Sequence, residues 1–338
     1  MIKEAIKIAV EKKDIPAEMA EEVMNEIMTG AASETDMSAY LTALRMKGET
    51  IEEITASAKG MRRACTRLLH NRDVLEIVGT GGDQAFTFNI STISSLVVAA
   101  AGVPVAKHGN RSVSSKCGAA DVLESLGVNI NADTDIMKNC LEDHNICFMF
   151  AQKYHPAMRF VAPVRKSLGV RTIFNILGPL ANPAGANMEL MGVYDKELVR
   201  PLAQVMLNLG VQSGMVVCGD DGLDEITMTT TTTGCEIRNG KLKNRIIDPE
   251  DYGFTYCDPS ELAGGNPEEN KQIAWDILSG KERGAKRDVV LLNAAVSLYI
   301  AKKCDSIQDG ITLAAEILDS QKALHKLETF IKATNQGE

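Results

Sequence analysis

Two glycine-rich segments, each placed directly after a short apolar run, constrain the fold of this chain most. Residues 79–83 (GTGGD) follow the apolar run 74–78, and residues 107–115 (KHGNRSVSS) follow the run 103–106. Loops that lack Cβ atoms let backbone N–H groups close on an anion, and an adjoining helix N-terminus adds positive partial charge. Two such loops at the ends of consecutive strands predict a βαβ unit able to hold two phosphate groups of one ligand.

Residues 1 to about 70 carry only helical patterns. Pro16 marks one helix start, Gly48 marks a helix end, and Thr50 with Glu53 fits a capping box at the next start. Apolar residues recur at near-helical spacing throughout this segment. The pattern predicts a small helical bundle with enough apolar surface to pack against a second copy.

From about residue 73 the pattern changes to short β-branched runs that alternate with helices. This alternation is typical of an α/β fold with a largely parallel central sheet flanked by helices. The expected helices include 91–101 and 119–126, and the expected strands are 74–78, 103–106, 146–150, 190–193, 215–218 and 236–238.

The helical part of the chain is predicted to be split in sequence. The segment of about 156–185 is helical and interrupted by Pro and Gly, unlike the α/β pattern on either side. We therefore expect a small all-helical domain of residues 1–70 with this returning segment. The larger α/β domain, which binds the anionic ligand, would comprise residues 71–155 and 186–338.

The overall charge excludes some classes of partner. The 338 residues include 45 acidic and 36 basic ones, a formal net charge of −9, so neither nucleic acid nor an acidic membrane is an expected partner. The eight cysteines form no CxxC pair, which argues against zinc ribbons and a disulfide framework. Without a signal-peptide core or an apolar run of ~18 residues, we expect a cytoplasmic protein.

The residues around the two loops are suited to phosphate. Residues 88–92 (FNIST) offer hydroxyls and an amide at the start of a helix, although Asn89 and Ser91 could instead simply cap that helix. The segment 107–116 packs cationic, amide and hydroxyl donors into ten residues, and its alternative interpretation is an exposed turn.

Two further groups of residues have both a functional and a plain interpretation. Adjacent carboxylates in residues 220–225 (DDGLDE) suit Mg²⁺, which takes few protein carboxylates and completes its shell with water and phosphates, but could form only an acidic turn. His155 stands near Arg159, Arg165 and Arg171, which could clamp a carboxylate or form a surface stripe.

Together these motifs closely resemble one family. GTGGD, NIST, KHGNRSVSSK, HPAMRFVAPVRKSLGVRTIFNILGPL and DGLDEI, in this order and spacing, are similar to those of the anthranilate phosphoribosyltransferases, and the resemblance spans nearly the whole chain. It implies a two-domain fold related to the pyrimidine nucleoside phosphorylases and a homodimer formed through the helical domain. The implied activity is Mg²⁺-dependent transfer of phosphoribosyl from 5-phosphoribosyl 1-pyrophosphate (PRPP) to the amine of anthranilate, in tryptophan biosynthesis.

The resemblance also implies roles for individual residues, with two Mg²⁺ ions per subunit. Lys107 and Arg111 would stabilise the transition state, with no certain catalytic residue beyond them. The metal ligands would be Ser91, Asp224 and Glu225. Anthranilate would meet Gly79, His108, Asn110, His155, Arg165 and Gly178. PRPP would contact Gly79, Gly82, Asp83, Thr87, Asn89, Ile90, Ser91, Thr92, Lys107, His108, Gly109, Asn110, Arg111, Ser112, Val113, Ser114, Ser115 and Ala119.

The chain departs from the common family pattern at Ala119, where many members have Ser, and at Tyr154 and Ala181. The loss of the Ser hydroxyl leaves only a backbone N–H to contact phosphate at position 119. Two rival functions fit the same fold, a nucleoside phosphorylase and an inactive relative that binds nucleic acid. The GTGGD and KHGNR loops argue against the first, and the acidic charge with the retained Asp224 and Glu225 against the second.

Overall fold

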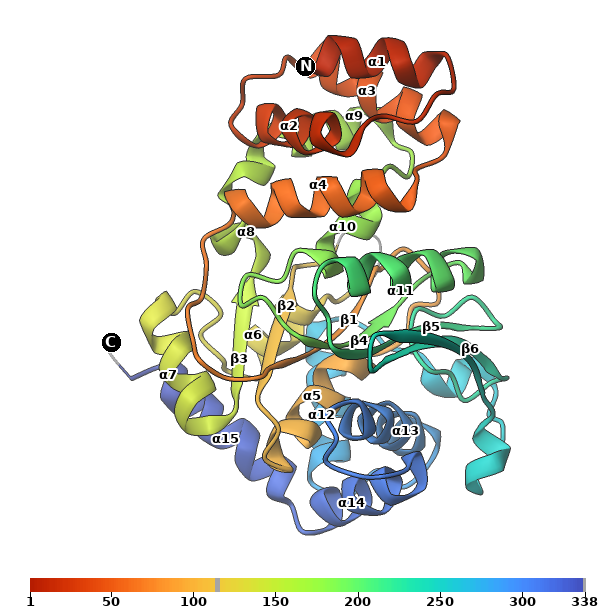
Figure 1. The fold of residues 1–338 in the computed structure, drawn as a ribbon. Coiled ribbons are helices and arrows are strands. Elements are labelled where there is room, and N and C mark those ends of the chain that lie inside the picture. The colour runs from red at the N-terminus through yellow and green to blue at the C-terminus, as the bar shows by residue number, and fades with distance from the viewer. Residues whose placement is uncertain (113–115, 337–338) are drawn as a thin grey trace.

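The computed structural model describes residues 1–112 and 116–336. The amino-terminal part is helical and occupies one end of the molecule, with the sheet below it and the carboxyl-terminal helices at the other end (Figure 1). Its helices are α1 (Ile2–Val10), α2 (Ala17–Met28), α3 (Glu34–Lys47) and α4 (Ile51–Ala64).

Local signals in the sequence set the ends of these helices. The capping box predicted for α4 is confirmed, because Thr50 accepts the Glu53 N–H while the Glu53 side chain accepts the Thr50 N–H. Helix α3 ends at Gly48, whose φ of 89° is open to glycine without strain. Helix α2 begins directly after Pro16, as predicted.

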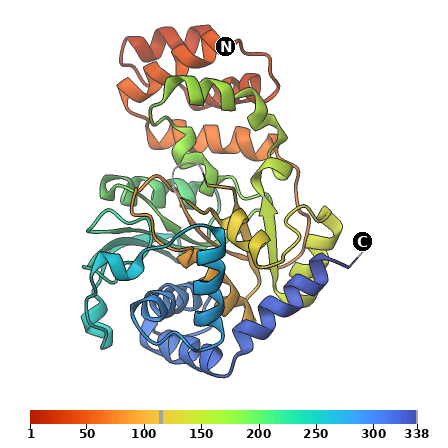
Figure 2. The same ribbon diagram turned by 180° about the vertical axis from the view of Figure 1, so that it is seen from behind.

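The returning segment packs against this bundle. It contains a 3-10 turn η1 (Pro156–Phe160), α9 (Ala162–Leu168) and α10 (Phe174–Leu180), and the short helix α8 (Ala151–Tyr154) lies just before it. Helix α9 lies across the bundle and contacts α3, while α10 contacts α4 (Figure 2). Val161, Val164 and Phe174 are buried in the same apolar cluster as Val23 and Tyr40. Burial of these side chains joins segments that are more than a hundred residues apart in sequence.

The sheet has seven strands in the order β3-β2-β1-β4-β5-β6-β7. The first five strands pair in parallel, and β6 and β7 add an antiparallel edge, so the prediction of a largely parallel sheet is confirmed. The strands are β1 (Leu75–Gly79), β2 (Val105–Gly109), β3 (Ile146–Phe150), β4 (Met188–Gly192), β5 (Ser213–Gly219), β6 (Thr232–Arg238) and β7 (Lys241–Ile247).

The two faces of the sheet belong to different apolar cores. Along β5, Met215 and Val217 face one core while Val216 and Cys218 face the other, as expected for residues that alternate across a strand. Helix α11 (Val199–Asn208) covers one face and also contacts α4. Among the described residues, seven helices contribute side chains to the core on the opposite face. They are α5 (Ile90–Ala100), α6 (Ala119–Ser125), α7 (Thr134–His144), α12 (Pro267–Leu278), α13 (Ala285–Ile300), α14 (Ile307–Asp319) and α15 (Lys322–Thr334).

The strand order marks one edge of the sheet as a candidate ligand site. The chain runs from β1 outward to β2 and β3, then crosses back to place β4 on the other side of β1. In open α/β sheets, ligands bind outside the carboxyl ends of the strands at such a reversal of strand order. The first glycine-rich loop follows β1 and therefore stands at this reversal, below the returning helical segment (Figure 1).

Glu53 is expected to contribute more to the stability of the bundle than Thr50, its partner in the capping box. Its buried carboxylate accepts the Ile15 N–H at 2.7 Å and pairs with the Lys47 ammonium at 3.0 Å. Glu53→Ala should lower the free energy of unfolding by roughly 3 kcal/mol, because it leaves buried donors unpaired. Thr50→Ala should cost about 1 kcal/mol. Urea unfolding followed by circular dichroism measures both, and equal losses would contradict this ranking.

Candidate active site

The first glycine-rich loop is held in place by a buried carboxylate from a distant part of the chain. The Gly81 N–H donates to Asp224 Oδ2 at 2.6 Å, and the Thr80 N–H donates to the Gly192 carbonyl at 2.9 Å. A Cβ atom on Gly79 would lie 2.3 Å from Asp224 Oδ2, so glycine is required for this close approach. The loop continues through Gly81 and Gly82, whose φ angles of 70° and 78° also favour glycine.

Three carboxylates gather at this point. Asp83 lies next to Asp224, and Glu225 Oε1 accepts the Ser91 N–H at 3.2 Å. Burial, together with the repulsion between these carboxylates, raises the pKa of Asp224 well above its usual range. Burial raises the pKa of Glu225 to about 7, against the lowering effect of Lys107 and Ser91.

The donor set fits a divalent cation. Carboxylate and hydroxyl oxygens are hard ligands of the kind that Mg²⁺ takes, and a cation would relieve the repulsion that raises these pKa values. Within the described part of the chain, no group of three or more His, Cys, Asp or Glu side chains is arranged to hold a metal ion by itself. A site with few protein ligands is the arrangement in which phosphates and water complete the Mg²⁺ shell.

Lys107 joins the second loop to this cluster. Its ammonium donates to the Ile77 carbonyl at 2.6 Å and to Ser91 Oγ at 3.2 Å, and the side chain is buried. Burial lowers the pKa of Lys107, while Glu76, Glu225 and Asp224 act in the opposite direction. The structure therefore brings together Lys107 and the three predicted metal ligands.

The second loop is organised by Asp121 on α6, a residue that the sequence analysis did not single out. Its carboxylate accepts the N–H groups of Ser112 and Gly118, each at 2.9 Å, and pairs with Arg111 at 3.0 Å. Arg111 also pairs with Glu124 at 2.7 Å, so the structure places its guanidinium against α6 rather than beside the carboxylate cluster. Val113, Ser114 and Ser115 lie outside the described residues.

Other predicted PRPP contacts are positioned around these loops. Asn89 donates to the Cys117 carbonyl and accepts from Asn270 instead of capping α5, so the simple capping interpretation of Asn89 is wrong. Ile90 and Thr92 are buried, Thr87 forms a bridge with Ala263, and Asn110 is exposed on the second loop. The space beside Gly109 is filled by Phe148 and Ala119, whose carbon atoms a Cβ atom there would meet within 3.1 Å.

Two neutral histidines connect the second loop to the returning segment. The rings of His108 and His155 are 4.9 Å apart, and both residues are buried. Backbone groups of α10 and its end favour the protonated form of each ring, at Gly178 for His108 and at Ala181 for His155, but burial outweighs them and lowers both pKa values. The Nε2 atoms have no partner among the described residues, and a Cβ atom on Gly178 would meet open space. Unpaired buried ring nitrogens point to a place where a polar ligand is received.

Arg165 on α9 differs from the other arginines near the site. Arg159 lies over Phe160, and Arg171 donates to the Gly82 carbonyl at 2.5 Å while stacking on Tyr194. Arg165 is half-buried, 5.9 Å from the Phe174 ring, and pairs with no carboxylate of the described residues. Burial alone lowers its pKa. A partly desolvated guanidinium without a counter-ion is suited to bind a carboxylate ligand.

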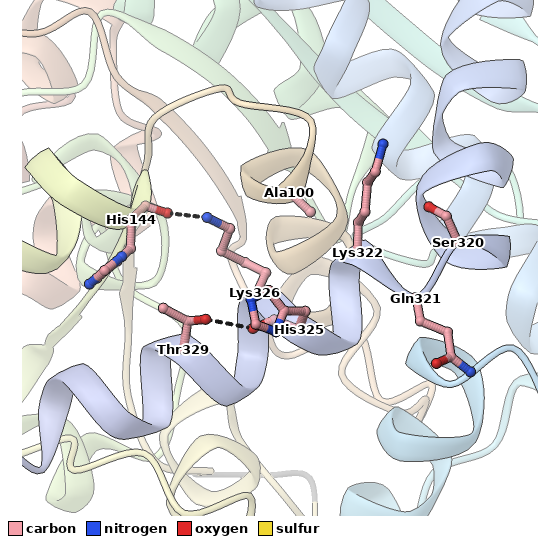
Figure 3. Close-up of a pocket in the computed structure, with 8 residues that line it drawn as sticks. All are labelled: Ala100, His144, Ser320, Gln321, Lys322, His325, Lys326 and Thr329. Atoms are coloured by element: carbon pink, nitrogen blue, oxygen red, sulfur yellow. Dashed lines mark hydrogen bonds between the residues drawn. The ribbon is translucent and has the colours of Figure 1, made fainter.

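A pocket of about 540 Å³ lies elsewhere, at the opposite edge of the sheet (Figure 3). It is formed where α5 and α7 end and α15 begins, and it contains none of the predicted site residues. Its lining consists of Ala100, His144, Ser320, Gln321, Lys322, His325, Lys326 and Thr329.

Of the helices in the described part of the chain, none is both long and apolar enough to cross a membrane.

The two buried histidines are expected to make stability depend on pH. Burial lowers the pKa of His108 to about 3 and that of His155 to about 4, while the unfolded chain takes up protons near pH 6.5. The stability contributed by neutral rings is therefore complete above pH 6.5 and is lost as pH falls toward these values, by about 2 kcal/mol per ring at pH 5. The free energy of unfolding, measured at several pH values, should fall less steeply with decreasing pH in His155→Gln than in the wild type. An equal dependence on pH in the two proteins would contradict a buried, neutral His155.

Comparison with known proteins agrees with this geometry. A family model described as the helical bundle domain of a glycosyl transferase family matches residues 3–65, and the a/b domain of that family matches residues 71–324. The anthranilate phosphoribosyltransferase of Lachnoclostridium phytofermentans is 60% identical over 336 residues, which are 99% of this chain and 100% of the relative. That of Methanobrevibacter smithii is 59% identical over 335 residues, with coverage of 99% and 100%.

Solved structures show the same likeness. The crystal structure of anthranilate phosphoribosyltransferase from Thermus thermophilus has a TM-score of 0.92 and 42% identity, covering 98% of this chain and 99% of its own. The enzyme from Saccharomyces cerevisiae in complex with PRPP and Mg has a TM-score of 0.91 and 28% identity, with coverage of 98% and 97%. With this similarity over nearly its whole length, the chain belongs to the anthranilate phosphoribosyltransferase family.

Proposed function

We propose that this chain transfers the phosphoribosyl group of PRPP to the amine of anthranilate, giving N-(5-phosphoribosyl)anthranilate and pyrophosphate, the second step of tryptophan biosynthesis from chorismate. The observation that carries the proposal is the joint placement of a glycine loop, Ser91, Lys107 and buried carboxylates at the reversal of strand order. The relatives that share this fold are named for the same reaction.

The proposal includes two domains, a homodimer and a cytoplasmic location. Residues 1–70 with about 156–185 form the helical domain, and residues 71–155 and 186–338 form the PRPP-binding domain. The apolar packing of α9 and α10 on the bundle supports the split helical domain. The exposed Val10 and Met46 side chains on that domain offer apolar surface to a second copy. No disulfide joins cysteines in the described part of the chain, in keeping with a reducing compartment.

We assign two Mg²⁺ ions to the carboxylate cluster, one held by Ser91 and Glu225 and one by Asp224 and Glu225. When bound, Mg²⁺ neutralises charge on the pyrophosphate as it leaves. The yeast enzyme in complex with PRPP and Mg, and a variant of it with Mg bound, support the choice of metal. Ser91 is held for this role by Lys107, which donates to its hydroxyl oxygen.

The residues of the chain account for the remaining chemistry. As the bond between C1 of the ribose and pyrophosphate breaks, the sugar becomes oxocarbenium-like and negative charge grows on the leaving oxygen. Lys107 and the backbone N–H groups of the glycine loops stabilise that charge, and Arg111 is held near the second loop by Asp121 and Glu124. The amine of anthranilate is neutral near pH 7, so orientation by Arg165 and Asn110 replaces a strong base.

A direct assay tests the function. Anthranilate fluorescence should fall only when PRPP and Mg²⁺ are both present, and pyrophosphate should appear in equal amount. Aniline should be a poor substrate, because nothing then pairs with the desolvated Arg165. Phosphorolysis of thymidine or uridine with constant anthranilate fluorescence would replace the transferase by the phosphorylase alternative, which the named relatives do not favour.

Glu225→Gln should slow the reaction by roughly 150-fold, on the scale of about 3 kcal/mol for one pre-aimed group that stabilises transition-state charge. The Mg²⁺ concentration needed for half-maximal rate should rise, because both proposed ion positions use Glu225. The exposed Glu250 provides a matched control, since Glu250→Gln removes an equal charge at the surface. Unchanged turnover and Mg²⁺ dependence in Glu225→Gln would remove this carboxylate from the mechanism.

Arg165→Ala should lower kcat/KM for anthranilate about 10- to 150-fold, the value of a charge-assisted hydrogen bond of roughly 1.5–3 kcal/mol. The KM for PRPP should change far less, because Arg165 stands on the returning segment and not on the phosphate loops. Lys166→Ala, at the exposed neighbouring position, is the control. Equal damage to both substrates would assign Arg165 a role in folding.

A further inference from the structure

The strands that carry the two phosphate loops separate from each other soon after they begin. Strand β1 pairs with β4 at five positions from Leu75 to Gly79, and β2 pairs with β3 at five positions from Val105 to Gly109. Between β1 and β2, however, the ladder has one register pair, Leu75 with Val105. Backbone groups of both strands therefore need other partners along the gap.

Side chains fill this β1–β2 gap. Glu76 of β1 is buried, and its Oε1 accepts the His108 N–H at 2.7 Å. Its Oε2 accepts a hydrogen bond from Asn182 Nδ2, which also donates to the Ala106 carbonyl at 2.8 Å. Glu76 and Asn182 thus replace ladder hydrogen bonds with a bridge that runs from one strand to the other. Glu76 contacts none of the residues assigned to metal.

Asn182 is itself held in one orientation. It lies two residues after the end of α10, is 3% exposed, and its Oδ1 accepts the Ala184 N–H at 2.8 Å. Because Oδ1 is used in this way, both bonds from Nδ2 depend on the same amide orientation. The bridge therefore ties the end of the returning segment to the strand that leads into the second loop.

Glu189 provides a natural contrast. It stands opposite Glu76 in the register of β4 with β1 and is equally buried, yet its Oε1 has no partner among the described residues. Burial, with the nearby Glu76 carboxyl, raises the pKa of Glu189 well above its usual range. Burial raises the pKa of Glu76 to about 7, while Asn182 and the His108 N–H both favour its ionised form.

We propose that Glu76 and Asn182 are a positioning pair that sets the separation of β1 and β2 and so the distance between the two phosphate loops. This inference rests on the proposed function. The pair acts through the backbone, without touching substrate. Lys107 and His108 lie in the end of β2 that the pair supports, and Asn110 directly follows it. A displacement of about 1 Å in such groups can slow a reaction 10²-fold.

Glu76→Gln tests the pair with the smallest change in shape. Glutamine keeps one acceptor oxygen, but its NH₂ group must face either the His108 N–H or Asn182 Nδ2, and both of these are donors. If Asn182 rotated its amide to offer an acceptor instead, it would lose its hydrogen bonds with the Ala184 N–H and the Ala106 carbonyl. The kcat at saturating substrates, per folded protein and well below the unfolding temperature, should fall about 10- to 100-fold. Glu189→Gln makes the same change at a buried carboxyl whose Oε1 has no partner among the described residues, and its kcat should stay within about threefold of the wild type.

Asn182→Ala approaches the same bridge from the other side and serves if Glu76→Gln fails to fold. Its kcat should fall in the same range, and the double variant should lose no more than the worse single variant, because the two residues act as one unit. A kcat within threefold of the wild type in folded Glu76→Gln or Asn182→Ala would overturn the proposal, even if the unfolding temperature had dropped.

Hydrogen exchange gives a readout that does not depend on turnover. Peptides covering residues 105–112 should exchange at least tenfold faster in Glu76→Gln than in Glu189→Gln, because the His108 N–H loses a carboxylate acceptor or the strand end moves. Equal exchange rates in the two variants would also overturn the pair. If the wild type consumed no anthranilate, the proposed function would fail and the exchange rates alone would decide whether the pair holds the gap.

Discussion

The close packing of Asp224 against the ends of β1 and β4 is the constraint on which the site depends. A Cβ atom on Gly192 would overlap the Asp224 carbonyl at 1.7 Å, and one on Gly79 would overlap its carboxylate. Only glycine at both strand ends lets this segment enter. Once there, Asp224 fixes the Gly81 N–H, and the next residue, Glu225, reaches the start of α5. The first loop, the helix N-terminus and the carboxylates are therefore placed by one packing contact.

The returning segment is the second element that the site needs. It begins directly after His155, whose ring lies beside that of His108, and it carries Arg171 to the Gly82 carbonyl, so both phosphate loops are in contact with this segment or its start. The apolar side chains of α9 and α10 are buried in the helical bundle, which fixes where these polar residues meet the sheet. Arg165, the proposed carboxylate ligand, can stay without an ion-pair partner among the described residues because apolar packing holds its helix in place.

Local signals in the sequence were enough to predict much of the fold, because they act between near neighbours. The α4 capping box, the Gly48 helix end and most strands follow from turn chemistry and apolar runs. Strand β7 was missed because its polar, exposed residues follow from its place at the sheet edge, which no local pattern reveals. The strand predicted to end at 106 extends to Gly109, because pairing with β3 draws the Lys107–Gly109 stretch into the ladder.

The site was predictable to the extent that its residues lie in loops with unusual composition. Glycine and hydroxyl residues marked both loops, and adjacent carboxylates marked Asp224 and Glu225, but their roles stay predictions. Asp121 and Asn182 were missed because each forms hydrogen bonds with backbone groups that only the folded chain brings to it. Asp121 accepts the Ser112 N–H, and Asn182 donates to the Ala106 carbonyl. Glu76 did leave a signal, since a charged residue inside the apolar run 74–78 is costly unless it is paired.

The same cost explains how an acidic chain prepares a place for an anionic ligand. Burial, together with the repulsion between Asp224, Glu225 and the neighbouring Asp83, raises the pKa of Asp224 and of Glu225, so the protein alone favours protons there. Lys107 offsets part of that charge, but burial also lowers its own pKa. A divalent cation would hold the carboxylates ionised, and the cation and Lys107 would both present positive charge to phosphate oxygens. Local electrostatics, and not the overall charge of −9, thus decides what this edge of the sheet can bind.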